Sequence, residues 1–95
     1  MQADFASIHN HHERAVFEAV LEGSKVYPSV GGDAELLADV ACVALNRLPA
    51  RYIRHQVDYS FFLTETEAAA SEQAIAHAVK RAFEFVQARV AMRAR

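Results

Sequence analysis

The segment Asp39–Arg51, which reads DVACVALNRLPAR, carries the strongest signals in this chain for its fold and its binding site. It begins as an almost wholly apolar run and ends in Asn46, Arg47, Pro49 and Arg51. Proline lacks a backbone N–H and disfavours helical geometry in the residue before it, so a helix is predicted to end beside Pro49. Guanidinium groups on a rigid helix end suit planar or anionic ligands, such as phosphates and the edge of guanine. This helix end is therefore the candidate binding site.

The sequence on the N-terminal side of this segment predicts two helices. The first is expected over residues 10–24, opened by the capping-box spacing of Asn10 and Glu13. The second is expected over residues 33–47 with Asp33 as its N-cap. Turn residues favour a loop over residues 27–32 between them. The second helix is apolar on most sides, which is typical of a helix packed by neighbours on several faces, and its Cys42 is expected to be buried and inert.

On the C-terminal side, residues 51–63 favour one or two short strands or an extended segment. The capping box Thr64-x-x-Glu67 then opens a helix predicted to run from Glu65 to about Arg93. Such a helix is about 45 Å long, whereas a globule of this size is about 30 Å across. The helix should overhang its own domain, so we expect its distal apolar positions to meet a second chain.

The expected fold class is therefore mainly α. It has three main helices, the last of them long, and one short extended or β segment, in a single domain over residues 1–95 that dimerises. Residues 1–8 are expected to be flexible.

Composition narrows the function classes. Apolar residues make up 53% of the 95 residues, which excludes disorder, and no apolar run reaches the length of a membrane span. One cysteine provides neither a disulfide framework nor a thiolate metal cluster, and Met1 is followed by no secretion signal, so a cytoplasmic protein is expected. The net charge of −2 argues against direct DNA binding. Charge is uneven, at −4 over residues 1–50 and +2 over residues 51–95, which is compatible with a small anionic ligand and equally with contacts between chains.

Metal binding and catalysis are less favoured readings. His9 and His12 have a spacing that can place two imidazoles on one ion, but a third and fourth ligand are not indicated, so no metal or other cofactor is expected. Ser60, His55 and Asp58 are triad-like residue types that lie too close in sequence for triad geometry. The few glycines form no phosphate-binding loop. We expect no enzyme.

Two interpretations of the arginines stay open. Arg47 and Arg51 have the R-x-x-x-R spacing of PilZ domains, but Leu63 stands where the PilZ motif needs glycine, and the chain is too helical for that barrel. The same arginines can still bind a guanine edge and a phosphate. Alternatively, Arg47 supports the helix end and Arg51 pairs with Asp39 or Asp58. Tyr52 is a possible stacking partner for a base, and Phe85 suggests a contact between chains.

The chain resembles the late competence development protein ComFB family. The resemblance rests on residues 39–52, DVACVALNRLPARY, similar to the family core D-x-x-A-L-A-L-N-x-L-P-P-R-Y, and on residues 9–16, HNHHERAV, similar to its opening N-x-x-E-x-x-V. It implies a compact, mostly helical dimer that binds a cyclic dinucleotide, cyclic di-GMP above all, and that regulates competence, type IV pili or surface behaviour. The positions carried over as ligand-binding candidates are Asp39, Asn46, Arg47, Arg51 and Tyr52, with Asn10 and Glu13 from the opening.

Two departures from the family pattern matter. Some members carry zinc-binding cysteines before the central helix, whereas residues 26–33 contain none here, so zinc is not inherited. Ala50 replaces the second proline of the family's L-P-P. The leading hypothesis is a non-enzymatic, homodimeric receptor for a cyclic dinucleotide; the alternative is a dimeric protein-interaction adaptor without a small ligand, which uses the long helix to recruit a regulatory partner.

Overall fold

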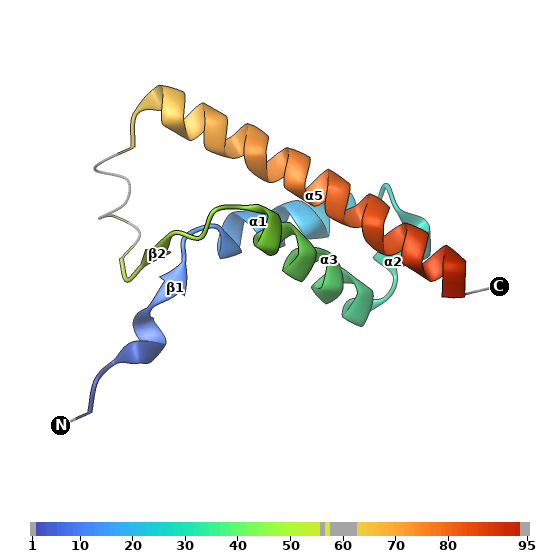
Figure 1. Ribbon diagram of the computed structural model, residues 1–95, viewed down its shortest axis with the longest axis horizontal. Helices are drawn as coiled ribbons and strands as arrows, with labels where there is room; N and C mark the ends of the chain where they lie inside the picture. The colour runs from blue at the N-terminus through green and yellow to red at the C-terminus, as the bar shows by residue number, and fades with distance from the viewer. Residues whose placement is uncertain (1, 56, 58–62, 94–95) are drawn as a thin grey trace.

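The computed structural model describes residues 2–55, 57 and 63–93, and its fold is mainly helical, as predicted (Figure 1). β2 confirms extended structure within the predicted segment 51–63, whereas Asp58, Tyr59 and Ser60, with the phenylalanines after them, lie outside the described residues. The elements in chain order are η1 (Phe5–Ser7, a 3-10 turn), β1 (His9–Asn10), α1 (Glu13–Gly23), α2 (Pro28–Gly31), α3 (Ala34–Arg47), β2 (Tyr52–Ile53) and α5 (Glu65–Arg93).

α3 begins and ends where the sequence predicts. The Asp33 carboxylate accepts hydrogen bonds from the backbone N–H groups of Glu35 at 2.9 Å and Leu36 at 3.2 Å, which caps the helix. At the other end Leu48 is extended, with φ −102° and ψ 144°. This is the backbone geometry that Pro49 favours in the residue before it. The proline-terminated helix is therefore confirmed.

The predictions around α1 are wrong in two places. α1 begins at Glu13 rather than near Asn10, because Asn10 pairs with Tyr52 in the sheet and His12 takes the N-cap position. The segment predicted as a loop contains the short helix α2, which starts at Pro28. Proline suits the first turn of a helix, where its missing N–H would have no partner and its fixed φ is already helical.

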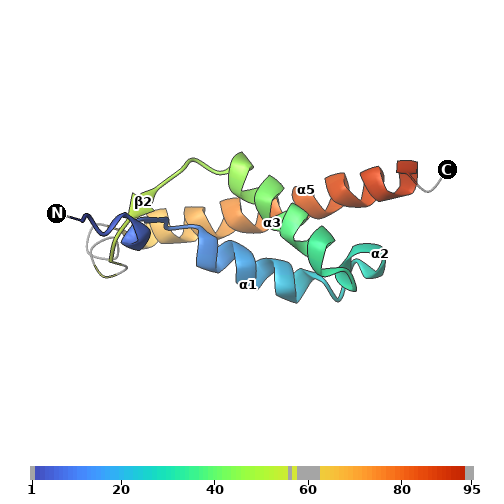
Figure 2. The same cartoon turned by 90° about the horizontal axis from the view of Figure 1, so that it is seen from below.

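α5 has the predicted bounds and extends beyond the rest of the fold. The Thr64 hydroxyl accepts a hydrogen bond from the Glu67 N–H at 3.1 Å, as expected of a capping box. The buried residues of α5 all lie between Ala78 and Val86, so its first turns project away from the core (Figure 1). The protein is flat, with extents of 50 × 39 × 19 Å, and Figure 2 shows it edge-on. Neither α5 nor another described helix is long and apolar enough to cross a membrane. The pairing of two chains stays a prediction.

The core lies where α3 meets α1 and α5. Near its centre the Phe83 ring stacks on Tyr27, with ring centroids 4.5 Å apart and planes inclined by 5°. A Cβ at Gly23 would lie 2.8 Å from the Phe83 ring, so a residue without a side chain lets α1 approach α5 closely. The buried apolar residues are Val16, Val20, Val30, Val40, Ala41, Ala44, Leu48, Ala78, Val79, Ala82, Phe83 and Val86.

Cys42 is exposed, so the prediction of a buried thiol is wrong. The described helices cover only part of the circumference of α3, and its fully buried residues are Val40, Ala41 and Ala44. An apolar composition on most sides of α3 therefore does not mean burial on most sides. The uncovered part of α3 is the ridge between the two grooves described below.

Replacement of Gly31 by alanine should destabilise the fold, because the new Cβ would collide with the Ser24 carbonyl oxygen. Overpacking of this kind costs about 1–3 kcal/mol of unfolding free energy. Gly32→Ala is the matched control, since a Cβ there meets nothing within 4 Å. Urea unfolding followed by circular dichroism measures both variants. Equal midpoints for the two would contradict the close contact at Gly31.

Candidate functional site

The loop that carries Arg51 is fixed to the residues just before α1. β1 and β2 pair antiparallel, with Asn10 opposite Tyr52. The His11 N–H donates to the Arg51 carbonyl oxygen at 2.6 Å. The Asn10 side-chain oxygen accepts two further hydrogen bonds, from the N–H of His12 at 3.1 Å and from the N–H of Arg51 at 3.3 Å. Residues 48–51, here called the arginine loop, are thus held by a segment about forty residues earlier in the chain.

Asn10 therefore acts first as a support. It was predicted as a ligand-binding residue from its motif position, but its amide oxygen is engaged with two backbone N–H groups. One of these belongs to His12 at the N-cap of α1 and the other to Arg51, so a single side chain joins the start of α1 to the arginine loop. Backbone N–H groups need partners when they leave water, which makes this oxygen costly to remove.

His12 fastens the same loop from the inside. It is 8% exposed, and its ring makes a hydrogen bond to the backbone of Pro49, which must be the carbonyl because proline has no N–H. Burial lowers the pKa of His12, the Pro49 carbonyl opposes that shift, and the nearby positive charge of Arg51 adds to it. Nδ1 of His12 is buried without a hydrogen-bond partner among the described residues. The neutral imidazole is thus the form that fits this position.

A groove of about 920 Å³ lies between α1 and α3, beside the arginine loop. We call it the α1–α3 groove. Four of the seven predicted site residues line it: Asn10, Glu13, Asn46 and Tyr52. The other lining residues are Ile8, His9, Phe17, Val20, Leu21, Leu37, Ala38, Ala41, Cys42, Leu45, Leu48 and Ala50. The groove is thus mostly apolar, with a few polar groups at the end nearest the loop.

The polar groups of this groove differ in their availability. Tyr52 is 69% exposed, so its ring is open to a stacking partner. The Asn46 amide nitrogen donates to the Cys42 carbonyl oxygen one turn earlier at 2.9 Å, which fixes the side chain along α3. Glu13 stands in the first turn of α1, where the helix dipole favours a carboxylate.

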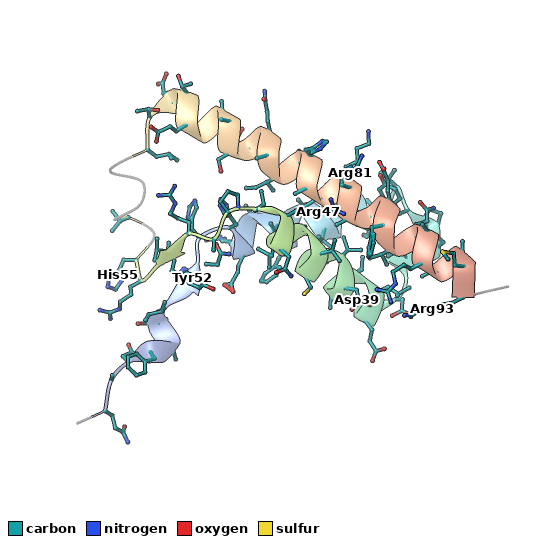
Figure 3. The ribbon with its side chains drawn as sticks, viewed as in Figure 1. Asp39, Arg47, Tyr52, His55, Arg81 and Arg93 are labelled. Atoms are coloured by element: carbon teal, nitrogen blue, oxygen red, sulfur yellow. The ribbon has the colours of Figure 1, made fainter. Side chains whose placement is uncertain are left out.

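Arg47 and Arg51 line neither this groove nor the second one described below. Arg47 is the last residue of α3 and follows Val43 by four residues, so it lies on the same side of the helix as Val43. Val43 lines the groove toward α5, so this is the side that faces α5 (Figure 3). Arg51 is exposed on the arginine loop between Ala50 and Tyr52, which both line the α1–α3 groove. The structure therefore does not bring the two arginines together in one groove of a single chain.

Asp39 lies in a different groove. This second groove, of about 300 Å³, separates α3 from α5, and we call it the α3–α5 groove. Figure 3 shows Asp39 and Arg93 at the same end of the molecule, away from Tyr52. The residues that line the groove are Leu36, Asp39, Cys42 and Val43 from α3, and Phe85, Val86, Arg89, Val90 and Arg93 from α5.

Sequence reasoning did not identify Arg89 and Arg93 as residues that line the same groove as Asp39. Phe85, Arg89 and Arg93 follow one another at intervals of four, so they share a face of α5. The Arg89 guanidinium carbon lies 5.8 Å from the centroid of the Phe85 ring, within cation–π range. The four-residue spacing was a visible signal, but its position opposite Asp39 depends on how the helices pack.

The histidine cluster does not gather ligands in the described part of the chain. His9 Nδ1 lies 3.1 Å from the Ser7 carbonyl oxygen, and the His12 ring is turned into the interior. Among residues 2–55, 57 and 63–93, no three histidine, cysteine, aspartate or glutamate side chains lie close enough together to hold an ion.

The stability of the fold should depend on pH through His12. Its pKa is lowered in the folded chain, so the unfolded chain takes up this proton more readily, and stability falls as pH drops below the ordinary histidine value of about 6.5. His12→Gln removes this titration. Thermal unfolding between pH 7.5 and pH 5.5 should therefore show a smaller loss of Tm in the variant than in the original chain. An identical loss in both would contradict the buried, neutral His12.

A comparison with known protein families gives a match that includes both motif regions, residues 9–16 and 39–52. Residues 9–90 match the family model for the late competence development protein ComFB. No curated protein matches the chain significantly. No solved structure does so either. The match spans β1, the arginine loop and almost all of α5, so the chain belongs to the late competence development protein ComFB family.

Proposed function

We propose that the chain is a non-enzymatic, homodimeric domain that binds a cyclic dinucleotide, with cyclic di-GMP as the favoured ligand. The family assigns it a competence-related role; the ligand, its control of competence, type IV pili or surface behaviour, and a cytoplasmic location are our proposal. The observation that carries it is the α1–α3 groove beside the arginine loop. Its volume of about 920 Å³ falls within the ~300–1,000 Å³ of typical small-molecule sites.

The groove offers a chemical partner for each part of a guanine nucleotide. Tyr52 presents an exposed ring on which a base can stack. Glu13 can accept hydrogen bonds from the N1–H and N2–H groups of guanine, and the Asn46 side chain supplies an amide. Glu13 repels phosphates, so we expect the phosphates at the rim, where Arg51 stands and can bind them with two parallel hydrogen bonds. Arg47 and Asp39 lie outside this groove and have no role in it.

Calorimetric titration with cyclic di-GMP, cyclic di-AMP and the linear dinucleotide tests the proposal. We expect cyclic di-GMP to bind tightest, since Glu13 reads donors that adenine lacks at the corresponding edge. Arg51→Ala should weaken binding about tenfold to a hundredfold, the value of one charge-assisted contact. Arg81→Ala is the control, because Arg81 is exposed on α5 and lines neither groove (Figure 3). No binding by the original chain, or equal affinity in both variants, would overturn the proposal.

A second pair of variants tests whether Asn10 supports the loop or touches the ligand. Asn10→Asp keeps the oxygen that holds the His12 and Arg51 N–H groups, whereas Asn10→Ala removes it. We expect the alanine variant to bind cyclic di-GMP at least tenfold more weakly than the original chain, since a loosened loop no longer positions Arg51 and Tyr52. The aspartate variant should lose less, because its carboxylate keeps both hydrogen bonds and only adds a charge that repels phosphate. Equal losses in the two variants would mean that the amide nitrogen of Asn10 is what matters.

The alternative function is that of an adaptor that binds another protein and no small ligand. The observation that favours it is the exposure of two large apolar side chains on α1: Phe17 is 47% exposed and Leu21 is 63% exposed. On the long helix α5, Phe85 is 42% exposed, so a variant at this position tests whether α5 binds a partner. Val86 is buried in the core, so a change there would report on folding. Tight binding of a cyclic dinucleotide that depends on Arg51 would exclude the ligand-free form of this alternative.

A further inference from the structure

We infer that the α3–α5 groove is the surface through which two copies of this chain pair about a twofold axis. The inference rests on the dimer of the proposed function and adds the interface, which neither the family match nor the motif residues specify. It also gives Asp39 a role, since this motif residue lies apart from the four that line the α1–α3 groove.

The first observation is a separation of opposite charges across one groove. Asp39 stands on the α3 wall, and Arg89 and Arg93 stand on the α5 wall. The ion pairs of the described residues are Arg14–Glu18, Lys25–Glu22 and Arg54–Asp4, so within this part of one chain Asp39 pairs with neither arginine. The groove thus presents an acidic wall and a basic wall whose charges do not satisfy each other.

Such an arrangement is self-complementary under twofold symmetry. In an isologous interface the same patch of both chains meets itself, so a contact from one residue to another is made twice. When two α3–α5 grooves face each other in antiparallel order, the acidic wall of each chain meets the basic wall of the other. Asp39 then pairs with the partner's Arg93, and Arg93 with the partner's Asp39.

The composition of the α5 wall also suits an interface. Phe85 and Arg89 line the groove, and Met92 lies beside it on the same face of α5, three residues after Arg89. Phe85 is 42% and Met92 is 74% exposed, so two large apolar side chains of this face meet water in the single chain. Aromatic residues, methionine and arginine are the residue types enriched in protein interfaces. A typical interface covers about 800 Å² on each chain, only a small part of the 7143 Å² surface of this one.

The apolar α1–α3 groove is a weaker candidate for the same contact. Glu13 is its charged lining residue, so two such grooves facing each other would bring like charges together. The α3–α5 groove is the one whose two walls attract each other across a twofold axis.

Charge reversal tests the inference. Sedimentation equilibrium gives the dimer dissociation constant of the original chain and of the variants Asp39→Arg and Arg93→Asp. We expect each single variant to dimerise at least tenfold more weakly, because like charges then face each other twice per dimer. The double variant Asp39→Arg/Arg93→Asp restores both pairs with their signs exchanged, so its dissociation constant should return to within about threefold of the original. Arg81→Asp, outside both grooves, is the control and should leave dimerisation unchanged.

Asp39 and Arg93 are exposed in the single chain, so these variants should keep their helicity, which circular dichroism checks. A chain that stays monomeric at 100 μM, or single variants that dimerise normally, would overturn the inference, as would a double variant no better than the singles. The same proteins titrated with cyclic di-GMP separate the two proposals. If the original chain binds the ligand but its dimer is insensitive to charge reversal, only this interface is contradicted. If the original chain does not bind the ligand, the proposed function is contradicted.

Discussion

The arrangement of the candidate ligand site depends on one amide oxygen. Asn10 Oδ1 accepts hydrogen bonds from the N–H groups of His12 and Arg51, and so joins the start of α1 to the loop that follows α3. Proline at position 49 makes this support necessary, because it ends α3 and leaves the residues after it without helical hydrogen bonds. The ladder between β1 and β2 and the buried His12 ring then complete the attachment. The exposed Arg51 and Tyr52 are thus carried on a fixed backbone.

α3 divides the molecule into two surfaces with different chemistry. On one side the α1–α3 groove is large and apolar, with polar groups near the arginine loop. On the other side the α3–α5 groove is smaller and carries opposite charges on its two walls. Cys42 lines both, which marks the exposed ridge of α3 between them. This division separates a surface suited to a small ligand from one suited to a second chain, although the motif at residues 39–52 contributes residues to both.

The helices could largely be predicted from the sequence, because their signals are local. Asp33 caps α3, Pro49 ends it, and Thr64 opens α5, each through atoms within a few residues. The start of α1 could not be predicted in the same way, since Asn10 leaves the helix to pair with Tyr52, forty-two residues later. The exposure of Cys42 could not be predicted either, because the apolar pattern of α3 indicates packing on several faces and does not show which side is left uncovered. The candidate site was predicted as one set of residues. Asp39 and Asn46 lie two turns apart on the same side of α3, and which groove each of them lines depends on how α1 and α5 pack beside that side, which the motif does not contain.

Asn10 and the pairing of β1 with β2 hold the arginine loop in place. Amide hydrogen exchange measured by nuclear magnetic resonance tests this attachment directly at three backbone N–H groups. Those of His11 and Arg51 form hydrogen bonds between the loop and residues 10–11, and that of His12 donates to the same Asn10 oxygen as Arg51. We predict that all three exchange slowly in the original chain, and that those of His12 and Arg51 lose their protection together when Asn10 is replaced by alanine while α5 stays protected. Exchange of the Arg51 N–H at the rate of an unstructured peptide in the original chain would contradict the account.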